Sequence, residues 1–269
     1  MLSRTAIFAR YDIASQPSRH NSHHAAPAYR VYVFSSPVEL TTAVTDVLIA
    51  ALSLGIVTKL RAFVLENRWK ALLWSWIFGL LALAAAAGAL AHGFSWPARA
   101  VVRFQHPIFL SLGLVVALVV VASIHDFYGR ETAKRILPWA VAAGLVFYVS
   151  TRFFGAAFLA FVLYEVVGML AALILFARTW LSRGSKGAGW IVLGVALTMV
   201  AAYVQTTDIS FRVVVPFDNN GSFHLVQIIA LLPLFQGLRA GMGAGSERQV
   251  VEATKPTVTD PGARRGRAS

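Results

Sequence analysis

The stretch PIFLSLGLVVALVVVASI, residues 107 to 124, contains no charged side chain. A helix of this length, at ~1.5 Å per residue, crosses most of the ~30 Å hydrocarbon core of a bilayer. The stretch also lacks the alternation of polar and apolar residues that is typical of a membrane β-barrel strand. It therefore predicts a transmembrane helix.

Six further apolar segments of similar character flank this one, so we expect seven spans. They cover about residues 38–59, 71–94, 136–151, 155–180, 188–205 and 222–238. Lipid offers no hydrogen-bond partners to the backbone, and helices satisfy this requirement within each segment. The predicted fold class is all-α, a seven-transmembrane helix bundle over residues 37–240. Residues 1–36 and the basic segment 241–269 are expected to be disordered tails.

The composition supports a membrane protein and excludes several other classes. Hydrophobic residues make up 57% of the chain and charged residues 13%, and the mean hydropathy is +0.65. Soluble domains carry about 25% charged residues, so a water-soluble enzyme, a disordered chain and a coiled coil are excluded. The chain has no cysteine, which excludes disulfides and thiolate metal sites. The bacterial inner (plasma) membrane is the expected location.

The basic residues predict the orientation of the bundle. The formal net charge is +12, and 16 of the 24 Lys and Arg residues lie in alternate loops and the C-terminal tail. The positive-inside rule places that side in the cytoplasm, so the N-terminus is outside. Because these charges flank apolar spans, they indicate contact with anionic membrane lipids and no nucleic acid.

Acids and imidazoles from several spans are expected to meet near the outer face. Glu39 and Asp46 lie on one face of the first span, His92 ends the second, and His224 begins the last. A metal or proton site would use His92 and His224 as nitrogen ligands. Asp46, Glu39 or Asp208 would then be an oxygen ligand or a general base. Alternatively, these are boundary residues that face water, and Glu39 caps the first helix.

Other polar residues in the spans have several interpretations. Glu165, in the middle of the fifth span, is either part of a proton relay or a neutral acid hydrogen-bonded between helices. His106 opens the third span as a third imidazole or a solvated boundary residue. His125 and Asp126 end that span on the inner side as an interfacial pair.

Two short motifs carry a resemblance to a known group. The first span contains Glu39…Thr45-Asp46, and the last contains Asn220…Phe223-His224-Leu225-Val226-Gln227. With seven spans and His92 at the end of the second, the chain resembles the superfamily of alkaline ceramidases, adiponectin receptors and related membrane hydrolases. It also resembles bacterial membrane proteins that carry the same two motifs.

The resemblance implies a zinc ion held by histidines, with a zinc-bound water that attacks a lipid amide. In that superfamily a serine lies four residues before the span-two histidine, an aspartate follows, and two histidines spaced by four residues occupy the last span. The chain departs from that pattern in three places. The span-two serine position is Gly88, the last span has a single histidine with Asn220 or Ile228 at the paired position, and no aspartate lies between Gly93 and Ile124. Either the oxygen ligands have changed, or metal and catalysis have been lost.

Three functions follow as hypotheses. In a metal-dependent, ceramidase-like lipid hydrolase or a degenerate relative, zinc is bound by His92, His224 and Asp46. Asp46 or Glu39 is then the base, and Asn220 orients water. In a non-enzymatic lipid-binding, sensing or transport component, the same pocket holds a small lipid ligand. A third hypothesis is a structural subunit of a membrane complex.

Overall fold

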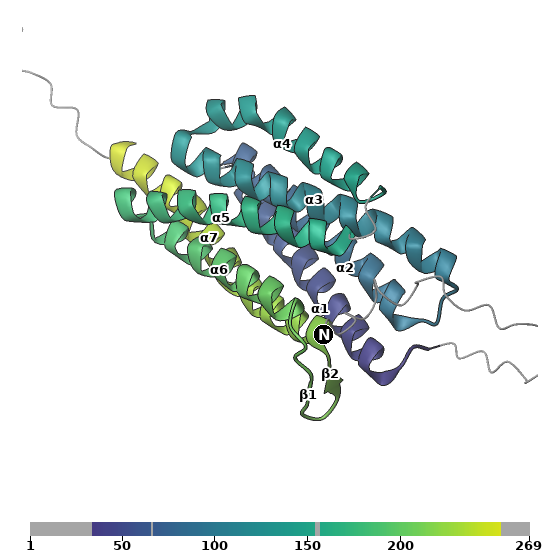
Figure 1. Cartoon of the computed structure of the whole chain (residues 1–269). Coiled ribbons are helices and arrows are strands. Elements are labelled where there is room, and N and C mark those ends of the chain that lie inside the picture. The colour runs from purple at the N-terminus through teal and green to yellow at the C-terminus, as the bar shows by residue number, and fades with distance from the viewer. Residues whose placement is uncertain (1–33, 66, 154–156, 254–269) are drawn as a thin grey trace, which may run out of the picture.

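A computed structural model describes residues 34–65, 67–153 and 157–253, and this part of the chain is almost entirely helical (Figure 1). The all-α prediction is confirmed. The helices are α1 (Pro37–Leu60), α2 (Arg68–Gly93), α3 (Ala98–Tyr128), α4 (Arg130–Ser150), α5 (Ala157–Arg183), α6 (Lys186–Gln205) and α7 (Asn219–Ala253). A 3-10 turn (Arg61–Phe63) follows α1, and strands β1 (Phe211–Arg212) and β2 (Pro216–Phe217) form a hairpin between α6 and α7.

Six helices of the described residues are long and apolar enough to cross a membrane, and α4 is not one of them. The six are α1, α2, α3, α5, α6 and the part of α7 up to Met242. α4 lies where the fourth span is predicted, but its first six residues include Arg130, Glu131, Lys134 and Arg135. The apolar remainder, 136–150, spans only about 22 Å as a helix. This shortness separates α4 from the other six.

The six apolar helices form a closed ring, and α4 lies outside it. Around the ring, α1 packs on α2, α2 on α3, α3 on α5, α5 on α6, α6 on α7, and α7 returns to α1. α4 packs mainly along α3, at the upper edge of Figure 1. The most deeply buried side chains, including Trp74, Phe176 and Leu231, lie within this ring.

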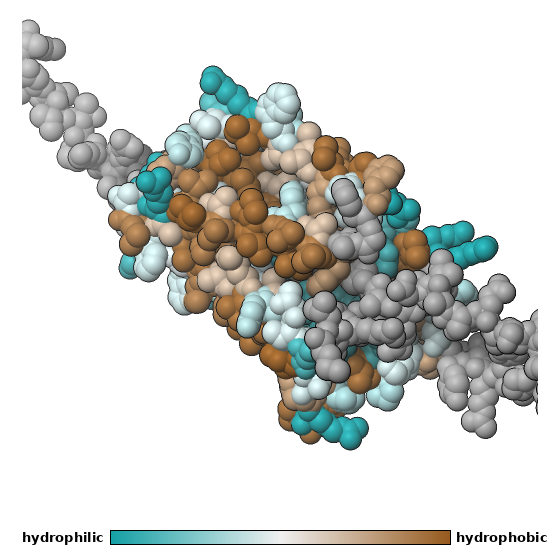
Figure 2. Space-filling model, viewed as in Figure 1, coloured by the Kyte–Doolittle hydropathy of each residue, from teal (hydrophilic) through white to brown (hydrophobic). Residues whose placement is uncertain are grey.

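The outer surface is apolar in the way that contact with lipid requires. Large side chains such as Trp139, Val146 and Val167 are exposed. Apolar residues cover the middle of the visible face, and hydrophilic residues gather toward its margins (Figure 2). Soluble monomers rarely expose contiguous apolar surface on this scale, so the surface is that of a membrane protein.

Glycines allow α6 and α7 to approach closely. A Cβ atom added to Gly187 would lie 2.7 Å from the carbonyl oxygen of Gly237 and 2.8 Å from the amide nitrogen of Gly241. Gly237 and Gly241 are four residues apart and therefore share one face of α7. Small residues at this spacing are typical of helix pairs that pack backbone to backbone in membranes.

Charged side chains join three helices at the end of the bundle that is predicted to be cytoplasmic. Lys70 Nζ on α2 lies 2.8 and 2.7 Å from the two carboxylate oxygens of Asp126 on α3, and His125 Nδ1 lies 2.9 Å from Asp126 Oδ1. Arg183, at the end of α5, donates to the carbonyl oxygen of Asp126 at 2.8 Å. The pairing of His125 with Asp126 is confirmed, and Lys70 is its third member.

Helix α3 begins earlier than the third predicted span. Residues 98–106, predicted as part of an outer loop, continue α3, which is preceded by Pro97. Alanine, arginine and glutamine favour helix without being apolar. Hydropathy therefore indicated where lipid would lie rather than where the helix begins.

The predicted disordered tails need two corrections. α7 runs on to Ala253, so residues 241–253 are helical, and the last seven of them, ERQVVEA, are mostly good helix formers. At the other end, Phe34 forms a bridge to Phe94, and its ring stacks on that residue at 5.8 Å. The remainder of the two tails, residues 1–33 and 254–269, lies outside the described residues.

Candidate binding site

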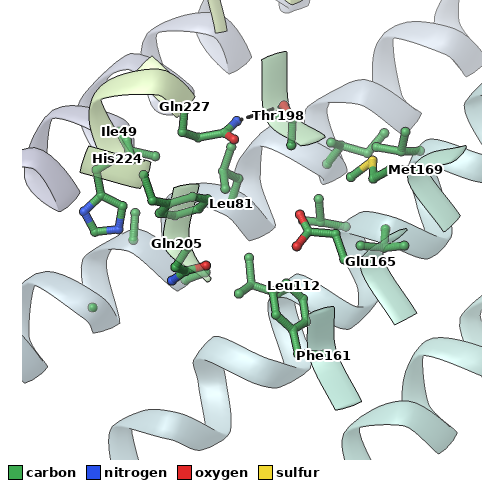
Figure 3. Close-up of a pocket in the computed structure, with 18 of the residues that line it drawn as sticks. Ile49, Leu81, Leu112, Phe161, Glu165, Met169, Thr198, Gln205, His224 and Gln227 are labelled. Atoms are coloured by element: carbon green, nitrogen blue, oxygen red, sulfur yellow. Dashed lines mark hydrogen bonds between the residues drawn. The ribbon is translucent and has the colours of Figure 1, made fainter. Parts of the chain in front are cut away.

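A pocket occupies the interior of the ring, and all six ring helices contribute to its wall. Its volume is about 170 Å³, roughly ten times what a single water molecule needs. The wall is mostly aliphatic and aromatic. The polar side chains that line it are Asp46, His92, Glu165, Thr198, Gln205, His224 and Gln227. Figure 3 shows His224 and Glu165 on opposite sides of this space.

Two side chains of α1 contact the two ring nitrogens of His224 on α7. Nδ1 lies 3.0 Å from Thr45 Oγ1, and Nε2 lies 3.4 Å from Asp46 Oδ1. All three side chains are buried. Since polar groups inside a bundle are costly without partners, these contacts join α1 to α7 at a fixed register.

The Thr45 hydroxyl bears on the tautomer of His224. Thr45 has one hydroxyl hydrogen, and its Oγ1 also lies 2.8 Å from the carbonyl oxygen of Thr42. If the hydroxyl donates to that carbonyl, it accepts from Nδ1–H of the ring. If it donates to Nδ1, the proton of the neutral ring is on Nε2, on the side of Asp46. In both cases an imidazole and a carboxyl group face each other at 3.4 Å beside the pocket.

Gly88 on α2 provides the space for the Asp46 carboxyl group. A Cβ atom at position 88 would lie 2.7 Å from Asp46 Oδ2. Within the described residues, that buried oxygen has no hydrogen-bond partner. The serine that the resemblance implies at this position is therefore incompatible with the observed placement of Asp46.

Glu39 holds His92 at the edge of the pocket. Glu39 Oε2 lies 2.7 Å from His92 Nδ1, which links the start of α1 to the end of α2. His92 lines the pocket, whereas Glu39 lies behind it. The cap of α1 is Ser36, whose hydroxyl accepts from the Glu39 backbone N–H at 3.4 Å, and Glu39 is the acid of the first turn.

Amides join α6 to α7 on the remaining side. Gln205 Nε2 donates to Asn220 Oδ1 at 3.2 Å, and Gln227 Nε2 donates to Thr198 Oγ1 at 3.3 Å. Asn220, predicted to orient water, therefore contacts Gln205, while Gln205 itself reaches the pocket. Asp208, weighed as an oxygen ligand, is exposed in the loop after α6.

The other predicted residues lie away from this cluster or lack the expected partners. His106 Nδ1 lies 2.9 Å from Tyr148 Oη, between α3 and α4. Glu165 on α5 faces the pocket from the opposite side and makes no hydrogen bond to the rest of the described chain. The interpretation of Glu165 as an acid hydrogen-bonded between helices is therefore wrong.

The arrangement does not fit a zinc site of the three-ligand kind. Across the described residues, no group of three or more His, Asp or Glu side chains is placed to hold a metal ion. Both nitrogens of His224 face α1, and Nδ1 of His92 faces Glu39. The set His92, His224 and Asp46 is brought to one pocket, where His92 contacts Glu39 and His224 contacts Asp46, so zinc binding stays a prediction that these contacts do not favour.

Sequence reasoning missed two parts of the site. Thr45 was noted only as the neighbour of Asp46, and Thr198 was not noted. A signal for Thr45 was available, because Thr41, Thr42 and Thr45 form a run of hydroxyls along the first turns of α1, near Asp46. The role of Gly88 needs the packing of α1 on α2 and has no counterpart in the sequence pattern.

Comparison with known proteins gives a family and no activity. The chain belongs to the Family of unknown function (DUF6962), which matches residues 41–242. This range contains every residue that lines the pocket, whereas Glu39 precedes it. Neither the curated proteins nor the solved structures gave a match to this chain.

Proposed function

We propose that this chain is an integral protein of the bacterial inner membrane that binds a lipid-like amphiphile inside its helix bundle. One observation carries the proposal: a pocket with apolar walls lies within the ring of apolar helices, and its polar groups lie in the half of it that faces the starts of α1, α5 and α7. Binding sites for small molecules are typically apolar cavities with a few placed polar groups. An elongated molecule with one polar end matches this distribution.

The direction of the helices supports seven crossings. α3 and α5 end side by side, since Arg183 donates to the carbonyl oxygen of Asp126. α5 therefore begins at the opposite end of the bundle, and α4 must return along α3 to reach it. The contact of His106 near the start of α3 with Tyr148 near the end of α4 agrees with this path. With α4 counted, the positive-inside rule gives an outer N-terminus and a cytoplasmic C-terminus.

Two neighbouring alanines on α2 provide the test of ligand binding. Ala85 is buried and lines the pocket, while Ala86 is exposed on the outer surface. We expect Ala85→Phe to fill the pocket and to reduce saturable binding of tritiated dodecan-1-ol by about tenfold or more, an effect of one large contact. Ala86→Phe should bind as wild type does. Binding is measured by scintillation proximity on the full chain in nanodiscs, with empty nanodiscs as background.

Equal binding by the two variants would contradict the proposal, as would no saturable binding in wild type. Size-exclusion profiles and unfolding temperatures of both variants show whether the bundle remains folded. Because the substitutions are chemically identical, a general effect of phenylalanine on the helix would appear in both.

A lipid-amide hydrolase is the second candidate, favoured by the buried acid–imidazole contact between Asp46 and His224. In this hypothesis the pair acts as general acid and base on a bound lipid amide. Release of fatty acid from an N-acyl amine lipid by the purified chain would support it. His92→Gln and His224→Gln should each abolish that release, whereas simple binding should survive one of them. If no fatty acid is released under any condition, the hydrolase hypothesis fails and the amphiphile-binding protein remains.

A further inference from the structure

We infer that the pocket takes a cationic amphiphile and that Glu165 is the group that pairs with its ammonium. The inference rests on the proposed function and adds to it the chemical class of the ligand. Its basis is a buried acid that faces the pocket opposite the acid–imidazole pairs and has no partner in the described chain.

Glu165 lies deep in the bundle. Its exposed fraction is 7%. Measured along the axis of α5, Glu165 lies about 12 Å from the first residue of the helix. Its neighbours one turn away on α5, Phe161 and Met169, also line the pocket, and Leu112 on α3 lies close by (Figure 3). A carboxyl group in such surroundings is expected to be protonated or paired with a cation.

The other polar residues of the pocket leave Glu165 without a compensating charge. Asp46 and Glu165 are the two acids that line the wall, and no lysine or arginine of the described residues lines it. His92 and His224 are already in contact with Glu39 and Asp46. The excess of acids over basic residues in the wall disfavours a ligand with an anionic head group, such as a carboxylate or phosphate. It favours a ligand with an ammonium group.

An aromatic ring beside the acid adds to this preference. Phe161 lies one helical turn from Glu165 on the same wall of the pocket. Ammonium groups are attracted to the faces of aromatic rings, most strongly where water is excluded. A single cation beside Glu165 would therefore meet both a counter-charge and an aromatic surface, with the apolar body of the ligand along the aliphatic wall.

The test compares two amphiphiles that differ only in their polar end. Tritiated dodecylamine and dodecan-1-ol are titrated against the full chain in nanodiscs, each corrected for empty nanodiscs. We expect wild type to bind the amine about tenfold more tightly than the alcohol, the effect of one charged hydrogen bond. Glu165→Gln should abolish that preference and leave the affinity for the alcohol nearly unchanged.

Glu131→Gln is the matched control, because Glu131 is an exposed acid on α4 that pairs with Lys134 outside the pocket. It should keep the preference of wild type. Equal binding of amine and alcohol by wild type, or a preference that survives Glu165→Gln, would overturn the inference while the proposed amphiphile site stands. Failure of both probes to bind wild type would remove the proposed function as well. The comparison within wild type needs no variant, so a poorly folded Glu165→Gln protein does not prevent a decision.

Discussion

Gly88 sets the distance between α2 and the Asp46 carboxyl group, and this leads to a residue-scale prediction. Serine at position 88 would place its Cβ 2.7 Å from Asp46 Oδ2, closer than van der Waals contact allows. We expect Gly88→Ser to lower the free energy of unfolding by about 1–3 kcal/mol, as overpacking does. Gly79→Ser on the same helix is the control, because a Cβ there meets nothing within 4 Å. Thermal unfolding of the purified chain measures both, and equal effects would show that the space at Gly88 is not needed.

At this scale the sequence predicted the residues of the site better than their partners. Asp46, His92 and His224 were placed at one end of the bundle because each lies near the end of its own span, and span direction alternates. The pairing of Glu39 with His92, and of Thr45 with His224, depends on how each helix is rotated about its axis. Hydropathy does not report that rotation, so a shared metal and separate pairs could not be told apart.

At the scale of single elements, the α6–α7 contact depends on glycine. A Cβ at Gly237 would lie 2.6 Å from Ile191 Cγ1 and 2.7 Å from the carbonyl oxygen of Gly187. We expect Gly237→Ala to destabilise the bundle by about 1–3 kcal/mol. Gly55→Ala on α1, where a Cβ meets nothing, should instead stabilise it by about 0.5–1 kcal/mol through helix propensity. Denaturant unfolding distinguishes the two, and a stabilising effect at position 237 would contradict the close packing described above.

The ends of helices were the least predictable elements. Apolar runs located the centre of each span, but α3 begins at Ala98 and α7 continues to Ala253, well beyond the apolar stretches. Charged and small residues continue these helices because backbone hydrogen bonding and propensity do not require lipid. For α4 the same effect lowers the hydropathy, since its first turn and a half is charged while the helix itself is 21 residues long.

At the scale of the whole molecule, the path of α4 decides whether the chain crosses the membrane six or seven times. Because the chain contains no cysteine, the unmodified chain serves as the negative control for thiol labelling. We expect Arg152→Cys, after the end of α4, to react with a membrane-impermeant maleimide in intact cells. Glu131→Cys, in its first turn, should react only after permeabilisation, because seven crossings place it in the cytoplasm. Both residues are exposed, so labelling of both from one side would contradict the seventh crossing.

Lipid-facing and interior surfaces together define what this molecule is able to hold. The outer surface is apolar and needs no ligand, whereas the interior pocket combines apolar walls with buried acids and imidazoles. The sequence showed the first of these through its hydropathy. It showed the second only in part, because the closure of six helices into a ring, with α4 outside, is not encoded in the order of the spans.

The most direct measurement of the central claim is native mass spectrometry of the full chain released from nanodiscs made with its own membrane lipids. The account predicts one retained amphiphile per chain for wild type and for Ala86→Phe, and a bare chain for Ala85→Phe. A bare wild-type chain, or an adduct that Ala85→Phe retains as fully as wild type does, would contradict a ligand inside the ring of helices.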